Sequence, residues 1–252
     1  MKWMRLLART VMACAMLFGA MTAQAQEKTG MKPGFVLKPG SVRIVLIRPT
    51  IRVGAQSTGG LYEPNADWTR DARQFIEAAL QTAQGNLGNV VIDYEEGTSG
   101  EGAVVSQYSN LFGTVADSVI EYQFFTGNRL PTKKRDNSFE WGVGPGLAQL
   151  QSMHGADYAL FINTYDAYGS TGRKALQVFG ALAGVGVTSG IHWGHAGLVD
   201  LKTGELVWLN ADRQMGGDVR TADGAVKRVG QLLEGFPGQA QVKPAPAATS
   251  AP

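Results

Sequence analysis

The chain has 252 residues, with 23 Lys or Arg, 21 Asp or Glu, 44% hydrophobic residues and one Cys. That length allows one domain of moderate size or two small ones, and the apolar fraction excludes a chain that is disordered throughout. No run of 18 apolar residues lies beyond the N-terminus, which excludes a polytopic helical membrane protein. One Cys excludes an internal disulfide or a thiolate zinc cluster. A formal charge of +2 argues against strong nucleic-acid binding.

Residues 1–25 are predicted to be a signal peptide. Lys2, Arg5 and Arg9 make the first nine residues basic, an apolar stretch follows over 11–21, and the segment ends on the small-residue cleavage site Ala23-Gln24-Ala25. The prediction is export to the periplasm, with Gln26 as the first mature residue and no transmembrane helix in the mature chain. Without the signal peptide the chain keeps 20 basic and 21 acidic residues, so the basic character belongs to the precursor.

Cys14 leaves an alternative open. Residues 11–14 could be a lipobox with Cys14 lipidated, although the apolar run continues well past it. In the favoured interpretation the mature protein has no Cys, which suits an oxidising compartment.

The first half of the chain opens with a β-branched strand over 41–49, followed by a Gly- and Ser-rich loop over 54–64. Apolar residues at three- and four-residue steps then predict a helix over 68–83. Asp67 is expected to cap its start, and Gly85 is expected to close it.

The middle of the chain is expected to hold a strand over 89–95 and a helix over 104–125. A polar connection over 126–142 contains a basic triplet, which a solvated loop explains. A short helix over 146–154 precedes a strand over 156–166 that is apolar on both faces and therefore central.

The second half begins with a Gly-rich apolar segment over 169–190. Strands over 191–201 and 205–210 follow, joined by a hairpin turn in which Gly204 takes a positive φ. The last helix is expected over 221–236.

This order of elements predicts an α/β (α+β) fold, a single domain with a mixed β-sheet of about five strands and helices packed on it. The domain is expected over 41–238, after an N-terminal arm over 26–40. A Pro- and Ala-rich tail over 239–252 is expected to be disordered or extended.

Two histidines, His192 and His195, are weak candidates for a metal site. In a strand, residues three apart point to opposite faces, and no third ligand is nearby in sequence. No Gly-x-Ser-x-Gly elbow or phosphate-binding glycine loop is present either. No catalytic residue, metal or cofactor is therefore assigned.

The apolar, uncharged segment over 179–190 is the first candidate for a contact surface. It could pack against a membrane or a neighbouring subunit, and a buried loop or helix edge is the alternative. The exposed sheet edge expected near Trp208 is the second candidate, and aromatic residues could add anchors, although buried packing also explains them. The candidate partner-binding residues are Phe179, Leu182, Val185, Trp193, Trp208, Tyr165 and Tyr168.

Two stretches carry a resemblance to a known group. The strand that starts Gly155-Ala156-Asp157 and the hairpin Asp200-Leu-Lys-Thr-Gly-Glu-Leu-Val-Trp208, followed by a final helix, resemble periplasmic envelope proteins related to the curli secretion channel subunit (CsgG-like). The pattern is also similar to the amino-terminal domain of TolB. The resemblance implies a mixed sheet with helices on its faces and an oligomer that works in secretion or envelope assembly.

The leading hypothesis is an exported, non-enzymatic envelope protein that binds a partner in cell-envelope assembly or secretion. The partner would be an envelope protein or a second copy, with peripheral contact to the outer membrane and no nucleic acid. The alternatives are an envelope hydrolase or metal-dependent enzyme centred on His192, His195 and Asp166, and a periplasmic small-ligand binder with a pocket lined by Tyr165, Tyr168 and Trp193.

Overall fold

The structure is a computed structural model that describes residues 27–95, 101–125, 127, 138–147 and 155–239. Several predictions fall outside these residues. They are the signal peptide with Cys14, the basic triplet, most of the short helix over 146–154, and the tail from 240 onward.

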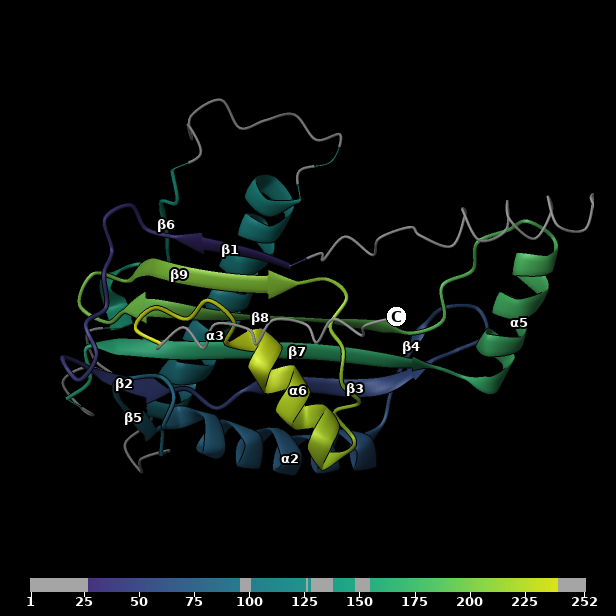
Figure 1. The fold of residues 1–252 in the computed structure, drawn as a ribbon, viewed down its shortest axis with the longest axis horizontal. Coiled ribbons are helices and arrows are strands. Elements are labelled where there is room, and N and C mark those ends of the chain that lie inside the picture. Colours follow the sequence, from purple (N-terminus) through teal and green to yellow (C-terminus); the bar gives the residue numbers. More distant parts are fainter. Residues whose placement is uncertain (1–26, 96–100, 126, 128–137, 148–154, 240–252) are drawn as a thin grey trace, which may run out of the picture.

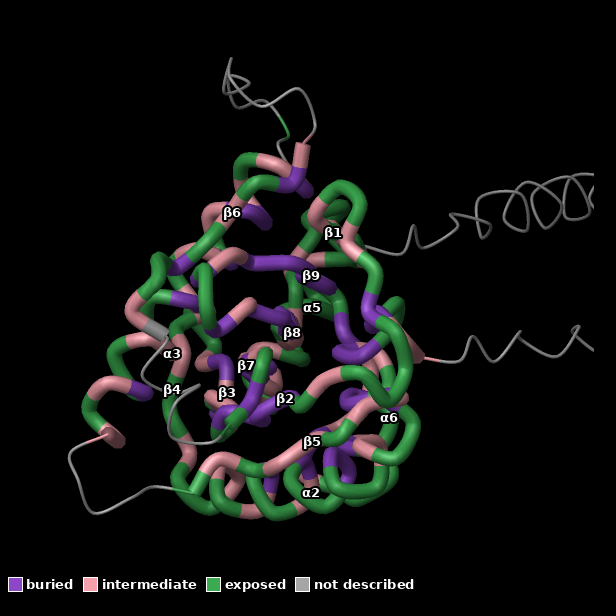
Figure 2. The backbone as a smooth tube through the Cα atoms, turned by 90° about the vertical axis from the view of Figure 1, so that its left-hand side faces the viewer, coloured by how far each residue is buried: buried purple, intermediate pink, exposed green. Residues whose placement is uncertain are grey.

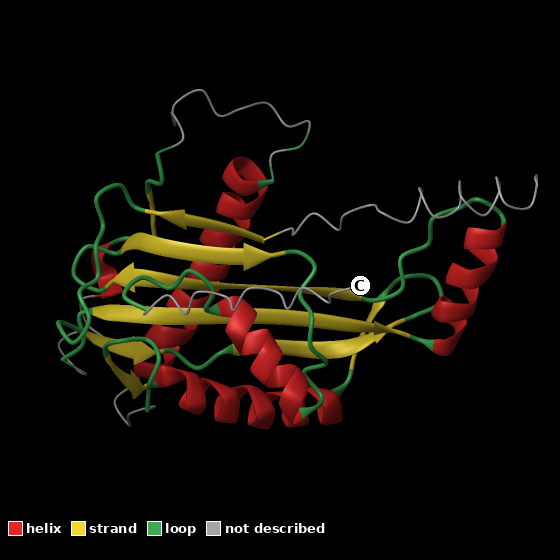
Figure 3. Ribbon diagram, in the orientation of Figure 1, coloured by secondary structure: helices red, strands yellow, loops and turns green. Residues whose placement is uncertain are grey.

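Among the described residues, nine strands form one mixed sheet, so the fold is α/β as expected but the sheet is larger than the predicted five strands (Figure 3). The strands are β1 (Glu27–Met31), β2 (Arg43–Leu46), β3 (Thr50–Gln56), β4 (Tyr62–Pro64), β5 (Val90–Asp93), β6 (Trp141–Gly142), β7 (Tyr158–Gly169), β8 (Ile191–Asp200) and β9 (Glu205–Asp212). Their main order is β1-β9-β8-β7-β2-β5, with β3 between β4 and β7, and with β6 on β9.

β7 lies at the centre of the sheet, as its apolar sequence predicted. It pairs antiparallel with β8 and parallel with β2 and then β3, which follow one another along the same edge. Leu46 pairs with Leu160 and Thr50 with Asn163, so the chain bulges between β2 and β3. Pro49 sits in this break, where a missing N–H costs no ladder hydrogen bond. The predicted loop over 54–64 is partly the β3–β4 hairpin.

Four helices are described: α2 (Ala66–Gln84), α3 (Glu101–Val119), α5 (Thr171–Leu182) and α6 (Ala222–Leu232). A π-helical turn over Ile120–Phe124 extends α3, and a 3-10 turn covers Pro145–Leu147. The helix expected over 68–83 is confirmed as α2, but Asn65 caps it rather than Asp67, because the Asn65 side chain accepts the Trp68 N–H at 2.9 Å. None of the described helices is long and apolar enough to span a bilayer.

The helices divide the core into two layers (Figure 1). α2 and α6 cover one face of the sheet, and α3 covers the other. Figure 2 shows that the buried positions concentrate on the central strands between these helices. The apolar spacing along α2, α3 and α6 follows from this arrangement, because each helix buries one stripe.

The hairpin between β8 and β9 forms as predicted. Asp200 Oδ1 accepts the backbone N–H groups of Lys202 and Thr203 at 2.8 and 2.9 Å. Gly204 has a φ of 72°, the left-handed conformation that glycine adopts without a steric penalty.

Part of the expected N-terminal arm is a strand. β1 pairs antiparallel with β9, with Met31 opposite Trp208. The sheet edge that was expected to be open at Trp208 is therefore covered.

Candidate functional site

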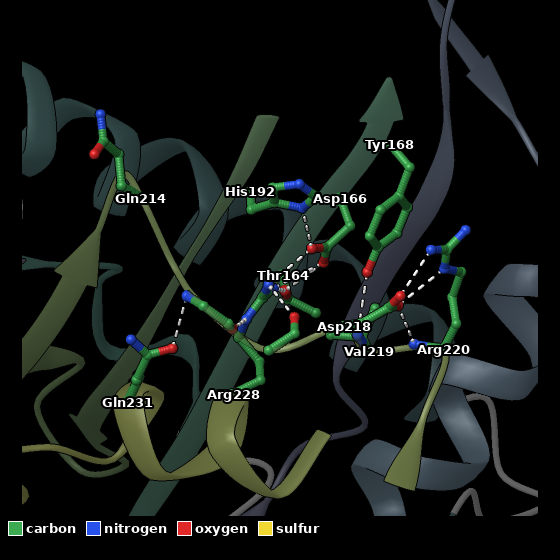
Figure 4. A network of polar contacts seen from close by, with 12 residues as sticks. Thr164, Asp166, Tyr168, His192, Gln214, Asp218, Val219, Arg220, Arg228 and Gln231 are labelled. Carbon is green, nitrogen blue, oxygen red and sulfur yellow. Dashed lines mark hydrogen bonds and ion pairs between the residues drawn. The ribbon is translucent and has the colours of Figure 1, made fainter. Parts of the chain in front are cut away.

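A buried polar network joins β7 to α6 (Figure 4). Arg228 points from α6 toward the sheet, and its Nη1 and Nη2 each donate to one oxygen of Asp166 at 2.8 Å. Its remaining N–H groups reach Thr164 Oγ1 and the carbonyl oxygens of Gly216 and Gly217. All five donors are satisfied, and this offsets the cost of burying the charge.

His192 completes the network from β8. The strand register sets it opposite Asp166, and His192 Nδ1 donates to Asp166 Oδ1 at 2.7 Å. Burial alone would raise the pKa of Asp166, but the hydrogen bonds from His192 and Arg228, together with their charge, hold that pKa below its usual value. Asp166 is therefore an ionised carboxylate that orients the imidazole, which is also the arrangement of a general base.

The next residue on this side of β7, Tyr168, holds the segment that leads into α6. Its hydroxyl oxygen accepts the Val219 N–H at 3.1 Å, and its ring lies 3.6 Å from the Arg220 guanidinium carbon. Arg220 donates to both oxygens of Asp218, at 2.9 and 2.7 Å. Tyr168 is thus half-buried and packs against the core, which is closer to the packing role that the sequence left open than to an exposed anchor.

His195 faces the other side of the sheet, as the strand spacing predicted. Its Nε2 lies 2.8 Å from Asn163 Nδ2, and its ring packs against Phe112 of α3. Burial lowers the pKa of His195 to about 3, so the ring is neutral. The sheet separates the two histidines, and the described residues include no group of three His, Cys, Asp or Glu side chains placed to hold a metal ion.

An aromatic row crosses the α3 side of the sheet. Tyr165 and Trp193 lie opposite each other on β7 and β8 and stack with ring centroids 5.4 Å apart. Tyr62 of β4 extends the row at 4.9 Å from Tyr165. All three are half-buried. The sequence did not single out Tyr62, because β4 lies in a predicted loop.

Trp208 is wholly buried on β9 and packs edge-to-face on Phe236, with ring centroids 5.2 Å apart. The prediction that Trp208 lies near an exposed sheet edge is wrong, because β1 pairs along β9.

α5 is the opposite case: none of its residues is buried, and it extends beyond the end of the sheet (Figure 1). Phe179 and Leu182 are 69% and 81% exposed, and Val185 in the following loop is also exposed. Arg173 anchors the helix by donating to the carbonyl oxygens of Thr188 and Thr58. Three of the predicted contact residues are thus exposed, two on α5 and one in the loop that follows it.

The segment that contains α5 is also basic. Between Asp166 and Asp200 the sequence has no acidic residue, whereas α5 carries Arg173 and Lys174 in its first turn. Lys174 is exposed. The result is an amphipathic, basic helix with an outward apolar side, the pattern of helices that lie on membrane surfaces.

The small-ligand hypothesis placed a pocket at Tyr165, Tyr168 and Trp193, and the most prominent hollow among the described residues lies elsewhere. A hollow of about 980 Å³ lies between α2 and α3, and none of Tyr165, Tyr168 and Trp193 lines it.

Comparisons with known proteins give a sparse picture. Neither a scan against protein-family models nor a search of curated proteins finds a match. Among solved structures, the PelC dodecamer from Paraburkholderia phytofirmans is 12% identical, with 85% of this chain and 99% of that chain covered and a TM-score of 0.39. Lipoprotein GNA1162 from Neisseria meningitidis is 14% identical, with 68% and 79% covered and a TM-score of 0.29. At such scores neither likeness establishes a function, and membership of the CsgG-like group stays a prediction.

Proposed function

We propose that this chain is an exported, non-enzymatic protein of the cell envelope that docks peripherally on an anionic membrane surface through α5. Its docking face consists of Lys174, Val178, Phe179, Leu182 and Val185. The carrying observation is that α5 buries none of its residues although its apolar side chains are large. Docking would hold the α/β domain at the membrane for a role in envelope assembly or secretion.

The energetics favour a surface contact outside the fold. Phe179 and Leu182 are mostly exposed to water in the described chain, so burying their exposed area in a lipid interface gains about 25 cal/mol for each Å² of apolar area. The basic first turn adds attraction to anionic headgroups, which salt screens. A helix of 12 residues is too short to span the bilayer, so it would lie in the interface.

The test is sedimentation of the mature chain from Gln26 with vesicles of phosphatidylglycerol and, separately, of phosphatidylcholine alone. We expect binding to the anionic vesicles that weakens as salt is raised. Val178→Glu should reduce binding strongly, because it puts a carboxylate into the docking face. Val226→Glu on α6 is the matched control, because the two valines are 60% and 59% exposed.

Two outcomes contradict the proposal: no binding of the unaltered chain to anionic vesicles, or equal loss with both substitutions. If Val178→Glu instead lowers the sedimenting mass of the protein in the absence of lipid, the docking face is an interface between copies, and self-association replaces membrane docking.

The non-enzymatic part of the proposal rests on how Asp166 is used. Both of its oxygens bind Arg228, and one of them also binds His192, so the network anchors α6 to the sheet. Under the rival hypothesis His192 is a general base, and His192→Gln would abolish a hydrolase activity without lowering stability. We expect the reverse result, a loss of stability that denaturant unfolding measures, with vesicle binding retained.

A further inference from the structure

The hollow between α2 and α3 lies where two parallel strands end side by side. β2 and β5 are neighbours and stop at the paired residues Leu46 and Asp93. The chain then breaks at Pro49 before β3 begins, and the residues of this break line the hollow. Its volume of about 980 Å³ falls in the range of small-molecule sites, roughly 300–1,000 Å³.

The topology explains why a crevice forms there. The helix that follows β2 and β3 is α2, which packs on one face of the sheet, and the helix that follows β5 is α3, which packs on the other. Where neighbouring parallel strands lead to helices on opposite faces, a crevice opens beyond their carboxyl ends. In open α/β sheets ligands bind at this position.

Three arginines from separate elements line this crevice: Arg48 in the break, Arg52 on β3 and Arg73 on α2. Within the described residues none of them has a carboxylate within ion-pair distance, and none has a hydrogen-bonded side-chain partner. These three arginines differ in this from Arg228, whose five N–H donors all have hydrogen-bond partners.

The acidic residues of the crevice leave the guanidinium groups available. Glu77 lies one turn beyond Arg73 on α2 but forms no ion pair with it among the described residues. Asp93 accepts a hydrogen bond from Gln84 Nε2 at 2.9 Å. Across the hollow, α3 offers the polar side chains of Ser106 and Asn110.

We propose that this crevice binds a small organic polyanion carrying phosphate or carboxylate groups, held by Arg48, Arg52 and Arg73. The planar guanidinium fork matches both acid groups bidentately. Ser106 and Asn110 are placed to hydrogen-bond neutral polar groups of the same ligand. The site is separate from the docking face and does not depend on it.

The test is titration calorimetry of the mature protein with pyrophosphate and with citrate, each at constant ionic strength. Saturable binding of either probe supports the site, and the tighter probe assigns its acid group. Arg73→Gln should weaken binding about tenfold or more, because a charge-assisted hydrogen bond is lost. Arg43→Gln, at the start of β2 and outside the hollow, is the matched control and should bind as the unaltered chain does.

Failure of both probes to bind, an unchanged affinity of Arg73→Gln, or an equal loss in Arg43→Gln would overturn the assignment. In the vesicle assay Arg73→Gln should behave as the unaltered chain, and Val178→Glu should keep its anion affinity. The two proposals can therefore fail separately.

Discussion

α5 and α6 begin in the same way. The hydroxyl of Ser170 caps α5 and the hydroxyl of Thr221 caps α6, and each accepts a hydrogen bond from a backbone N–H of the first turn. Both are short and amphipathic, with 12 and 11 residues. α6 buries its apolar stripe and a charged Arg228 under the same face, whereas α5 buries nothing. Local sequence thus makes both helices, but only the tertiary fold gives one of them a place in the core.

The largest expected difference in stability is between variants of the two arginines that anchor these helices, Arg228 in α6 and Arg173 in α5. Arg228→Met leaves Asp166 buried with no guanidinium partner and only the hydrogen bonds from Thr164 and His192, and we expect a loss of about 3–5 kcal/mol in the free energy of unfolding. Arg173→Met in α5 removes bonds to two surface carbonyls and should cost about 1 kcal/mol or less. Urea unfolding at pH 7 measures both. Equal losses would mean that the buried network does not hold α6.

Two leucines, one on each helix, allow the contribution of apolar packing to stability to be compared in the same way. Leu232 of α6 is wholly buried, and Leu232→Ala should cost about 2–5 kcal/mol because it leaves a cavity. Leu182 of α5 is 81% exposed, and Leu182→Ala should change stability by no more than about 0.5 kcal/mol. Urea unfolding of both variants checks this. A large loss for Leu182→Ala would show that α5 packs on the domain.

A third expectation concerns the side of the sheet away from α6. Burial lowers the pKa of His195 from 6.5 to about 3. Between those values the unfolded state binds a proton that the folded state excludes, so stability falls as the pH is lowered, by up to about 1.4 kcal/mol per pH unit. In His195→Gln the slope of unfolding free energy between pH 6.5 and pH 5 should be smaller. An unchanged slope would contradict the neutral buried imidazole.

The smallest expected effect on stability comes from Glu27 of β1, which lies near Glu234, just after the end of α6. Glu27 of β1 has its pKa raised to about 7, first by burial and then by the carboxylates of Glu234 and Asp212. A raised carboxyl pKa means that stability is lost as the pH rises from about 4.5 to 7. Glu27→Gln should therefore stabilise the protein at pH 8, by less than about 1 kcal/mol because the site is half-exposed, and should have little effect at pH 4. Thermal unfolding at the two pH values measures this, and a destabilised variant at pH 8 would refute it.

Elements with a strong local pattern could be read from the sequence. The β-branched runs predicted β2, β5, β7, β8 and β9, and the apolar spacing predicted α2, α3 and α6. The short strands were missed for a physical reason. β1 is polar, with the sequence EKTGM, and is a strand because it pairs with β9 about 180 residues later in the chain. Such pairing leaves no periodic signal in the strand itself.

The buried network shows the same limit at the level of single residues. Asp166 in an apolar strand was visible in the sequence, and Arg228 stands three residues after Ala225 on the buried stripe of α6, which is a usable signal for a buried cation. Nothing local indicates that the two meet across 62 positions. The arginine crevice was missed for a similar reason, because its arginines come from three elements.

By itself the sequence determined the α/β class, the central strand and the β8–β9 hairpin. These features depend on neighbours within a few turns or strand steps of the chain. Only the tertiary structure decided that Trp208 is covered, that His192 pairs with Asp166 while His195 contacts Asn163, and that three arginines share one crevice. Pairing and packing between distant segments set these features, and their free energy is shared by residues that are far apart in the sequence.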